Sequence, residues 1–535
     1  MPPSRCLHLT PLRGAIDSAL CSRGPRCQSS LGSAHYFSTS STNSYPSPGP
    51  AKGVRTLRLK KKGPPQKAAR PPEPGERKAF RKRIVLSNTN ALPVKAIAPL
   101  SADAVSVDKS EVYTLSPDII DRLRAVEAFK TKQGWSFFHT PAVLMTKESR
   151  ALGKEMDGIS GEHLNDQDAE NASRKIAIKK SSRKVIVGEK GSGKSVLLLQ
   201  AMSMAFLRGW VVINLPDGRE LASSHTAFSP IHGTSPVQYA QPAYTSKLLK
   251  QILDANEKVL QKLFISEKPK FHLPIKEGMS LAGLLELGMN DQDRAWAVFQ
   301  VFWRELTKTN SSINAAAGER PPVLLCLDNM SHVMTESQYK VLNDAGKLTS
   351  VHAHDLALVN HFAQHLSGAA QFPNGGMVLA ATSASDGAKA DAMCVGISIA
   401  ETRQALTSGT PIPPEAISNY SKLQSLSPDK NPDPLALSNF HSPFVPIDER
   451  VLYTLDKADV IRLAGLNHAD STTLMKYWAK SGMYRGSVLP WNVDEARALS
   501  GGAIVGELEK KVVRYLQREP MVLEGETGGK KIRVH

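Results

Sequence analysis

A short stretch of glycine, lysine and serine, Gly188–Ser195, has the residue types and spacing that bind the phosphates of a nucleotide. It reads Gly-Glu-Lys-Gly-Ser-Gly-Lys-Ser and fits the phosphate-loop pattern GxxxxGK[ST]. In such a loop the glycines let backbone N–H groups curl around the α- and β-phosphates, the lysine reaches the β- and γ-phosphates, and the final hydroxyl can ligate Mg²⁺. The residues expected to contact the nucleotide are the loop and the position after it: Gly188, Glu189, Lys190, Gly191, Ser192, Gly193, Lys194, Ser195 and Val196.

The segments on either side of this loop are the strand and the helix that phosphate binding requires. Residues 184–187 are strand-like, and Val196–Leu207 has the composition and length of an apolar helix, which Arg208-Gly209 would end. The positive end of the helix dipole and the unpaired N–H groups of its first turn would add to the attraction for phosphate. The alternative, a chance match in a glycine-rich turn, does not account for both flanking segments.

A second apolar run, residues 322–329, ends in an acid and fits the Walker B pattern. In that pattern the acid at the end of a buried strand helps to hold Mg²⁺ beside the hydroxyl of the phosphate loop. Ser195 and Asp328 are therefore the expected Mg²⁺ ligands. The alternative is a buried strand capped by a turn-forming Asp-Asn pair.

The residue after Asp328 is Asn329, which bears on hydrolysis. In AAA+-type ATPases a glutamate at this position orients the attacking water. An amide cannot accept a proton from that water, so fast hydrolysis is not expected unless Glu336 or another acid takes over. We assign no catalytic residue from the sequence.

A third strand candidate, Met377–Ser383, also ends in small polar residues. In the additional-strand class of phosphate-loop proteins this strand lies between the other two, and its terminal polar residue senses the γ-phosphate. Thr382 or Ser383 could do so, or could equally cap the strand.

The rest of the chain predicts an α/β fold, an AAA+-like P-loop parallel sheet flanked by helices. Trp210–Leu215 is a second strand after the loop helix, which makes a βαβ unit. Helical patterns are expected over 116–129, 140–153, 246–264, 279–287 and 291–306, with a short strand around Trp135–Phe138. We place the nucleotide-binding domain at 115–400, a Pro/Ser-rich connector at 401–447, and a C-terminal helical, lid-like domain at 448–535, whose first helix spans 448–464.

The front of the chain is basic and cannot form a core. Residues 1–93 hold 17 Lys or Arg against 3 Asp or Glu, which accounts for +14 of the net charge of +17. Residues 1–45 are rich in Arg and Ser and poor in acids, as in a mitochondrial transit peptide. The basic, Pro-rich extension at 46–114 could neutralise RNA phosphates or be only a solvated tail. No run of eighteen apolar residues occurs, so membrane insertion is not expected.

Taken together, the Gly188–Gly218 segment, the VLLCLDNMSHVM strand and the basic leader resemble the death-associated protein three family, in a fungal-like version. These are GTP-binding proteins of the mitochondrial small ribosomal subunit. The resemblance covers about 115–535 and implies bound GTP or GDP with Mg²⁺, a position in the head of the small subunit in the mitochondrial matrix, and contacts with its ribosomal RNA and neighbouring ribosomal proteins.

Guanine specificity depends on this resemblance alone. The Asn-Lys-x-Asp and Asp-x-x-Gly runs of ordinary GTPases are absent from the sequence, so ATP is not excluded. Two functions are therefore expected to compete. One is a structural ribosomal protein that retains a nucleotide, supporting subunit assembly and mitochondrial translation. The other is a mitochondrial AAA+-type ATPase that remodels a partner protein or RNA.

Overall fold

The computed structural model describes residues 84–515, with gaps at 96, 108, 162–180, 268–273, 277, 311–316, 344–345, 385–389 and 411–447, and also residues 522–523 and 532–533. The expected transit peptide, most of the basic extension and most of the Pro/Ser-rich connector lie outside these residues. Across the described residues, no helix combines the length and the apolar character that crossing a membrane would need.

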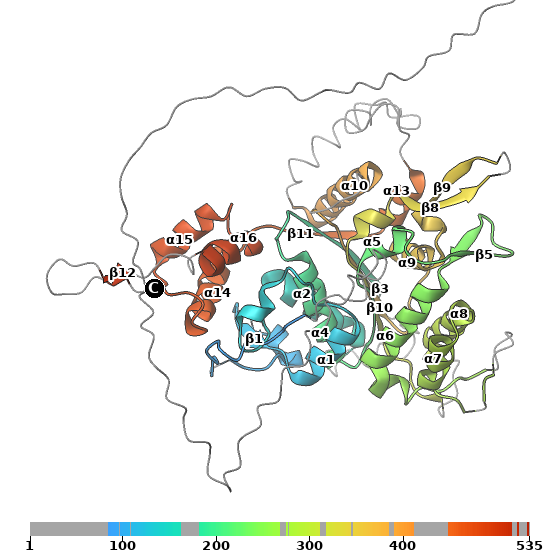
Figure 1. The fold of residues 1–535 in the computed structure, drawn as a ribbon, viewed down its shortest axis with the longest axis horizontal. Helices are drawn as coiled ribbons and strands as arrows, with labels where there is room; N and C mark the ends of the chain where they lie inside the picture. The colour runs from blue at the N-terminus through green and yellow to red at the C-terminus, as the bar shows by residue number, and fades with distance from the viewer. Residues whose placement is uncertain are drawn as a thin grey trace, which may run out of the picture. The chain divides into compact units, whose positions relative to one another are not determined.

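A parallel sheet of five strands organises the fold (Figure 1), in the order β11-β3-β10-β7-β4. Every neighbouring pair in it is parallel. The strands are β3 (Ser181–Gly188), β4 (Val211–Leu215), β7 (Val323–Leu327), β10 (Gly376–Ala381) and β11 (Asp459–Leu463). The third strand predicted from the sequence, β10, does lie between the loop strand β3 and the Walker B candidate β7, so that prediction is confirmed.

Helices cover both faces of the sheet, because successive side chains of a buried strand point into two different apolar layers. In β7, Leu324 and Cys326 belong to one core, while Leu325 and Leu327 belong to the other. The first core is completed by α1 (Pro117–Ala125), α2 (Lys147–Ser160) and α4 (Lys194–Leu207). The second is completed by α6 (Pro242–Leu260), α7 (Leu281–Asn290), α8 (Ala295–Leu306), α9 (Ala357–Ser367), α10 (Asp391–Ser408) and α13 (Glu449–Leu455). The predicted architecture of a parallel sheet flanked by helices is confirmed.

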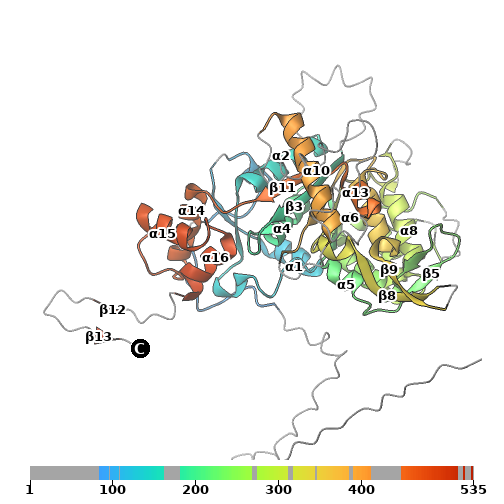
Figure 2. The same ribbon diagram turned by 90° about the horizontal axis from the view of Figure 1, so that it is seen from above.

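The C-terminal helices form a third, smaller core. They are α14 (His468–Lys480), α15 (Pro490–Leu499) and α16 (Val505–Glu509), which continues as a π-helical turn over Lys510–Tyr515. Figure 2 shows these helices gathered in one group. Their apolar residues pack with Phe138 from the N-terminal part of the chain.

Several short elements complete the described chain. The antiparallel strand pairs are β1 (Val112–Thr114) with β2 (Ala142–Leu144), β5 (Ser229–Ile231) with β6 (Gln238–Ala240), β8 (Glu336–Leu342) with β9 (Leu348–His352), and β12 (Val522–Leu523) with β13 (Ile532–Arg533). The short helices are η2 (Ala102–Val105), η3 (Gly134–Phe137), α5 (Gly218–Ala222), η6 (Met330–Val333) and η7 (Ala353–Asp355).

Some sequence expectations are wrong, each because tertiary packing decides the outcome. The helix expected over 448–464 is α13 followed by β11, whose pairing with β3 extends the central sheet. The C-terminal helical group therefore begins only after β11. The predicted boundary at 400 falls inside α10. The short strand expected around Trp135–Phe138 is the helical turn η3, and the helix expected over 140–153 is β2 followed by α2.

The predicted extension at 46–114 also ends too late. Leu86, Leu100 and Val105 are buried in the core that lies against α4, so the folded chain begins before residue 114. The basic composition of residues 46–83 conceals this short apolar stretch when the whole segment is averaged.

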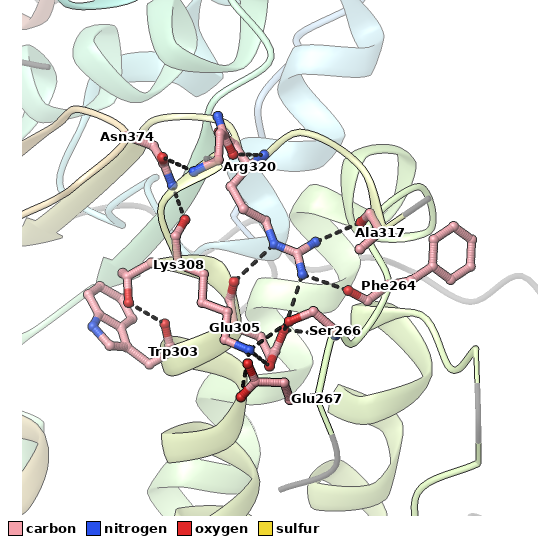
Figure 3. A network of polar contacts seen from close by, with 11 residues as sticks. Phe264, Ser266, Glu267, Trp303, Glu305, Lys308, Ala317, Arg320 and Asn374 are labelled. Carbon is pink, nitrogen blue, oxygen red and sulfur yellow. Dashed lines mark hydrogen bonds and ion pairs between the residues drawn. The ribbon is translucent and has the colours of Figure 1, made fainter. Parts of the chain in front are cut away.

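A buried arginine, Arg320, joins three parts of the fold just before β7 (Figure 3). Its guanidinium donates to the carbonyls of Phe264, Ala317 and Glu305 and forms an ion pair with the Glu305 carboxylate at 3.2 Å. Glu305 also pairs with Lys308 at 2.8 Å. Burial alone would raise the pKa of Glu305, but hydrogen bonds from Lys308 and Ser266 hold that pKa below its ordinary value. Every charge in this buried network therefore has a partner.

Replacing Arg320 with methionine should destabilise the protein by about 3–5 kcal/mol, because Glu305 and three carbonyls lose a buried donor. Urea unfolding of the purified protein measures this loss. The control is Arg304→Met, at an exposed arginine on α8 next to Glu305, which should change the free energy of unfolding by less than about 0.5 kcal/mol. Equal losses in the two variants would show that the Arg320 network contributes no special stability.

Candidate nucleotide-binding site

The phosphate loop follows β3 and has a backbone that only glycine adopts readily. Gly193 has φ +98°, in the left-handed region, and is the N-cap of α4. At Gly188 a side chain would lie 2.7 Å from both the Leu463 carbonyl oxygen and the Ser192 hydroxyl. These glycines therefore allow the chain to turn sharply from the sheet into the helix, as the sequence predicts.

The loop offers hydrogen-bond donors that its own structure does not use. In the described chain, no backbone acceptor pairs with the N–H groups of Gly191, Gly193 or Lys194. The buried hydroxyl of Ser192 is also without a partner among the described residues. These groups stand at the positive end of the α4 dipole. A polyphosphate, which carries negative charge and only acceptor oxygens, fits such a site.

Lys194 lies over the same loop. Its ammonium donates to the carbonyls of Gly188 at 2.6 Å and Glu189 at 2.7 Å. Burial lowers the pKa of Lys194, while the negative charges of Asp328 and Glu189 oppose that shift. The ammonium is thus held where the loop turns, and it can exchange a carbonyl partner for a phosphate oxygen. Glu189 and Lys190 are exposed, and Ser195 and Val196 are half-buried at the start of α4.

Asp328 follows β7 and is almost completely buried. One carboxylate oxygen accepts from the N–H of Asn329 at 2.9 Å, and the other lies 3.4 Å from the ammonium of Lys130. Parallel strands bring Asp328 and the phosphate loop to the same edge of the sheet. Among the described residues no cluster of His, Cys, Asp and Glu could hold a metal by itself. Ser195 and Asp328 would thus hold Mg²⁺ only together with phosphate oxygens, which is how Mg²⁺ is usually bound.

The side chain of Asn329 is hydrogen-bonded to a second acid, Asp217, rather than being free to contact a water. Its amide donates to the Asp217 carboxylate at 2.9 Å, and its backbone lies in the left-handed region with φ +57°. Glu336, which the sequence suggests as a substitute acid, has Arg450, Asp448 and Asp355 as its charged neighbours. The acid beside Asn329 is instead Asp217. Sequence reasoning missed it, although its Pro-Asp-Gly turn follows β4, the strand next to β7.

The two candidates at the end of β10 both have hydrogen-bond partners within the protein. The N–H and hydroxyl of Thr382 both donate to the Ile186 carbonyl, at 3.0 Å and 3.3 Å. The N–H of Ser383 donates to the Ser331 hydroxyl at 3.2 Å. Of the two roles expected for Thr382, the structure therefore shows the cap that joins β10 to β3.

The C-terminal helices contact the phosphate loop directly. The N–H of Gly506, in α16, donates to the Gly191 carbonyl at 2.9 Å. A side chain at Gly506 would lie 3.1 Å from the Gly191 Cα. The loop therefore offers N–H groups to a ligand while one of its carbonyls holds α16.

Comparisons with known proteins identify a family and a relative that this chain resembles. Residues 169–511 match the family described as mitochondrial ribosomal death-associated protein 3. A relative from Neurospora crassa, the small ribosomal subunit protein mS29, is 36% identical over 451 residues, which are 83% of each chain. Among solved structures, a Walker-type ATPase of Pyrococcus abyssi has 15% identity over 66% of each chain, with a TM-score of 0.30.

The family match covers the phosphate loop, the Walker B candidate and most of the C-terminal helices. It confirms the resemblance drawn from the sequence, and the mitochondrial localisation expected from the composition of the leader is confirmed with it. The chain therefore belongs to the mitochondrial ribosomal death-associated protein 3 family.

Proposed function

We propose that this protein is a structural component of the small subunit of the mitochondrial ribosome, in the matrix, and that its phosphate loop retains a purine nucleotide as part of the fold. The ribosomal role is supported by the family and by the name of the Neurospora relative. The nucleotide is GTP or GDP with Mg²⁺, as the family resemblance implies. Its phosphates lie against the loop from Gly188 to Val196, and Ser195 and Asp328 hold the cation.

The observation that carries the nucleotide proposal is the loop itself. A glycine-dependent turn, unpaired N–H groups, a buried ammonium and a helix N-terminus converge after β3. The strand order, with β10 between β3 and β7, is the additional-strand arrangement of AAA+-like phosphate-loop proteins. These features favour a bound polyphosphate over a loop that serves only as a turn.

A retained nucleotide stabilises the native state without being hydrolysed. A ligand that binds only the folded protein adds RT ln(1 + [L]/Kd), about 4 kcal/mol at a thousandfold excess over Kd. That is a large share of the stability of an ordinary domain, about 5–15 kcal/mol. Asn329 and its bond to Asp217 favour this role over the competing one of a partner-remodelling ATPase.

In this role the protein would contact ribosomal RNA and neighbouring ribosomal proteins. The basic segment at 46–83, outside the described residues, would contact RNA phosphates and release their counterions. Lys530 and Lys531, also outside the described residues, are positively charged too and would likewise contact RNA phosphates.

Lys194→Ala should bind nucleotide at least about tenfold more weakly, because the phosphates lose a charge-assisted donor. Nucleotide released from the purified protein by denaturation is identified by chromatography, which also decides between guanine and adenine. Cosedimentation with small subunits then measures assembly, which should fall in Lys194→Ala and remain normal in Lys250→Ala, at an exposed lysine on α6. Normal assembly by a nucleotide-free Lys194→Ala protein would contradict the structural role of the nucleotide.

Wild-type protein should turn over GTP or ATP well below about 1 per second, the lower end for working phosphoryl-transfer enzymes. A double variant, Asp217→Asn with Asn329→Glu, exchanges the acid and the amide while keeping a hydrogen bond between them. It should hydrolyse about 10²–10⁴-fold faster, the usual contribution of a placed general base. Phosphate release under single turnover measures both rates. A wild-type rate near 1 per second or above would defeat this interpretation of Asn329.

A further inference from the structure

Lys130 is a second lysine at the candidate site, and no part of the phosphate-loop pattern contains it. It comes from the turn after α1, about sixty residues before the loop. Its ammonium lies 3.4 Å from the Asp328 carboxylate and donates to the carbonyl of Pro216, the last residue before the Asp217 turn. The side chain of Asp328 is only 7% exposed, so this ion pair is shielded on the acid's side.

The turn that carries Lys130 is fixed from both ends. Before it, the Val126 carbonyl accepts from the buried amide of Asn214 on β4 at 2.8 Å. After it, the Gln133 side chain accepts from the N–H of Lys130 at 2.8 Å and from the Trp135 indole at 2.6 Å. The neighbouring Phe129 ring packs edge-on against Trp135. The position of the ammonium is therefore built by the fold, rather than being one conformation of a loose surface chain.

We propose that Lys130 is a built-in counter-cation for Asp328 that makes nucleotide retention depend less on Mg²⁺. This inference rests on the proposed function, because it concerns the same site. The ammonium beside Asp328 balances a carboxylate charge that would otherwise repel the phosphates unless Mg²⁺ were bound between them. Lys194, from the loop itself, is the cation that attracts the phosphates directly.

The size of the effect follows from ordinary electrostatics. Two opposite unit charges about 4 Å apart interact strongly in partly buried surroundings, and the Asp328 side chain is almost fully buried. We therefore expect removal of the Lys130 charge to change the contribution of Asp328 to Mg²⁺ binding by at least about tenfold. Because Asp328 is already paired, a nucleotide held by the loop and Lys194 remains bound when free Mg²⁺ falls, which suits a structural ligand.

The test compares GDP affinity in Mg²⁺ and in EDTA by isothermal titration calorimetry of the full-length protein. Lys130→Met keeps the apolar stem and removes the charge, while Lys130→Arg keeps the charge. Lys258→Met is the matched control, because Lys258 forms a comparable lysine–aspartate pair with Asp118 on the surface, at 2.6 Å. Thermal unfolding without nucleotide reports whether each variant is folded.

The dissociation constant of GDP in EDTA, divided by that in Mg²⁺, should be at least about tenfold larger in Lys130→Met than in wild type. It should return toward the wild-type value in Lys130→Arg and stay unchanged in Lys258→Met. In an Asp328→Asn background, Lys130→Met should no longer change the ratio, because the two residues act through one contact. Equal ratios in wild-type and Lys130→Met protein would overturn the inference while leaving nucleotide binding intact. A wild-type protein that binds no nucleotide even with Mg²⁺ would overturn the proposed function and this inference with it.

Discussion

The parallel direction of all five central strands is the constraint on which the site depends. Because the strands run the same way, the residues after β3, β10, β7 and β4 all emerge at one edge of the sheet. The phosphate loop, Thr382, Asp328 and Asp217 are therefore neighbours although they lie far apart in the sequence. An antiparallel strand at β7 would carry Asp328 to the opposite edge, about five residues or 16 Å away.

The sequence was most informative where local chemistry allows one outcome. The Gly188–Ser195 pattern predicts the turn, the helix after it and the buried strand before it, since the glycine positions and the apolar runs agree. The order of the three strands β3-β10-β7 was also predictable, because a loop strand, a strand ending in an acid and a third apolar strand define a known arrangement. Asp459–Leu463 was not, because its five residues read equally well as the end of a helix, and only pairing with β3 makes them a strand.

Long-range partners were beyond the reach of sequence patterns. Lys130 and Asp217 stand on turns that carry no motif, and their meaning comes from the strands that these turns adjoin. The N-terminal segment from residue 84 was hidden for a different reason, since a few apolar residues follow directly after a long basic run. Arg320 resembles any surface arginine in the sequence, yet the carbonyls of Phe264 and Ala317 surround it in the structure. In each case the decisive information is which segments the fold brings together.

The contact between Gly191 and Gly506 gives the proposed nucleotide a structural reach beyond its own pocket. The Gly191 carbonyl accepts from Gly506 of α16, while the N–H groups of the loop remain available for the proposed phosphate, so one short turn would serve the ligand and the C-terminal helices together. Those helices share their core with Phe138, and Lys130 precedes that residue in the same N-terminal segment. A nucleotide that fixes the loop would thus favour one position of the C-terminal helices and of the N-terminal segment that packs with them. An architectural nucleotide needs no turnover, and the Asn329 amide, bonded to Asp217 where AAA+-type ATPases carry a general base, is consistent with that role.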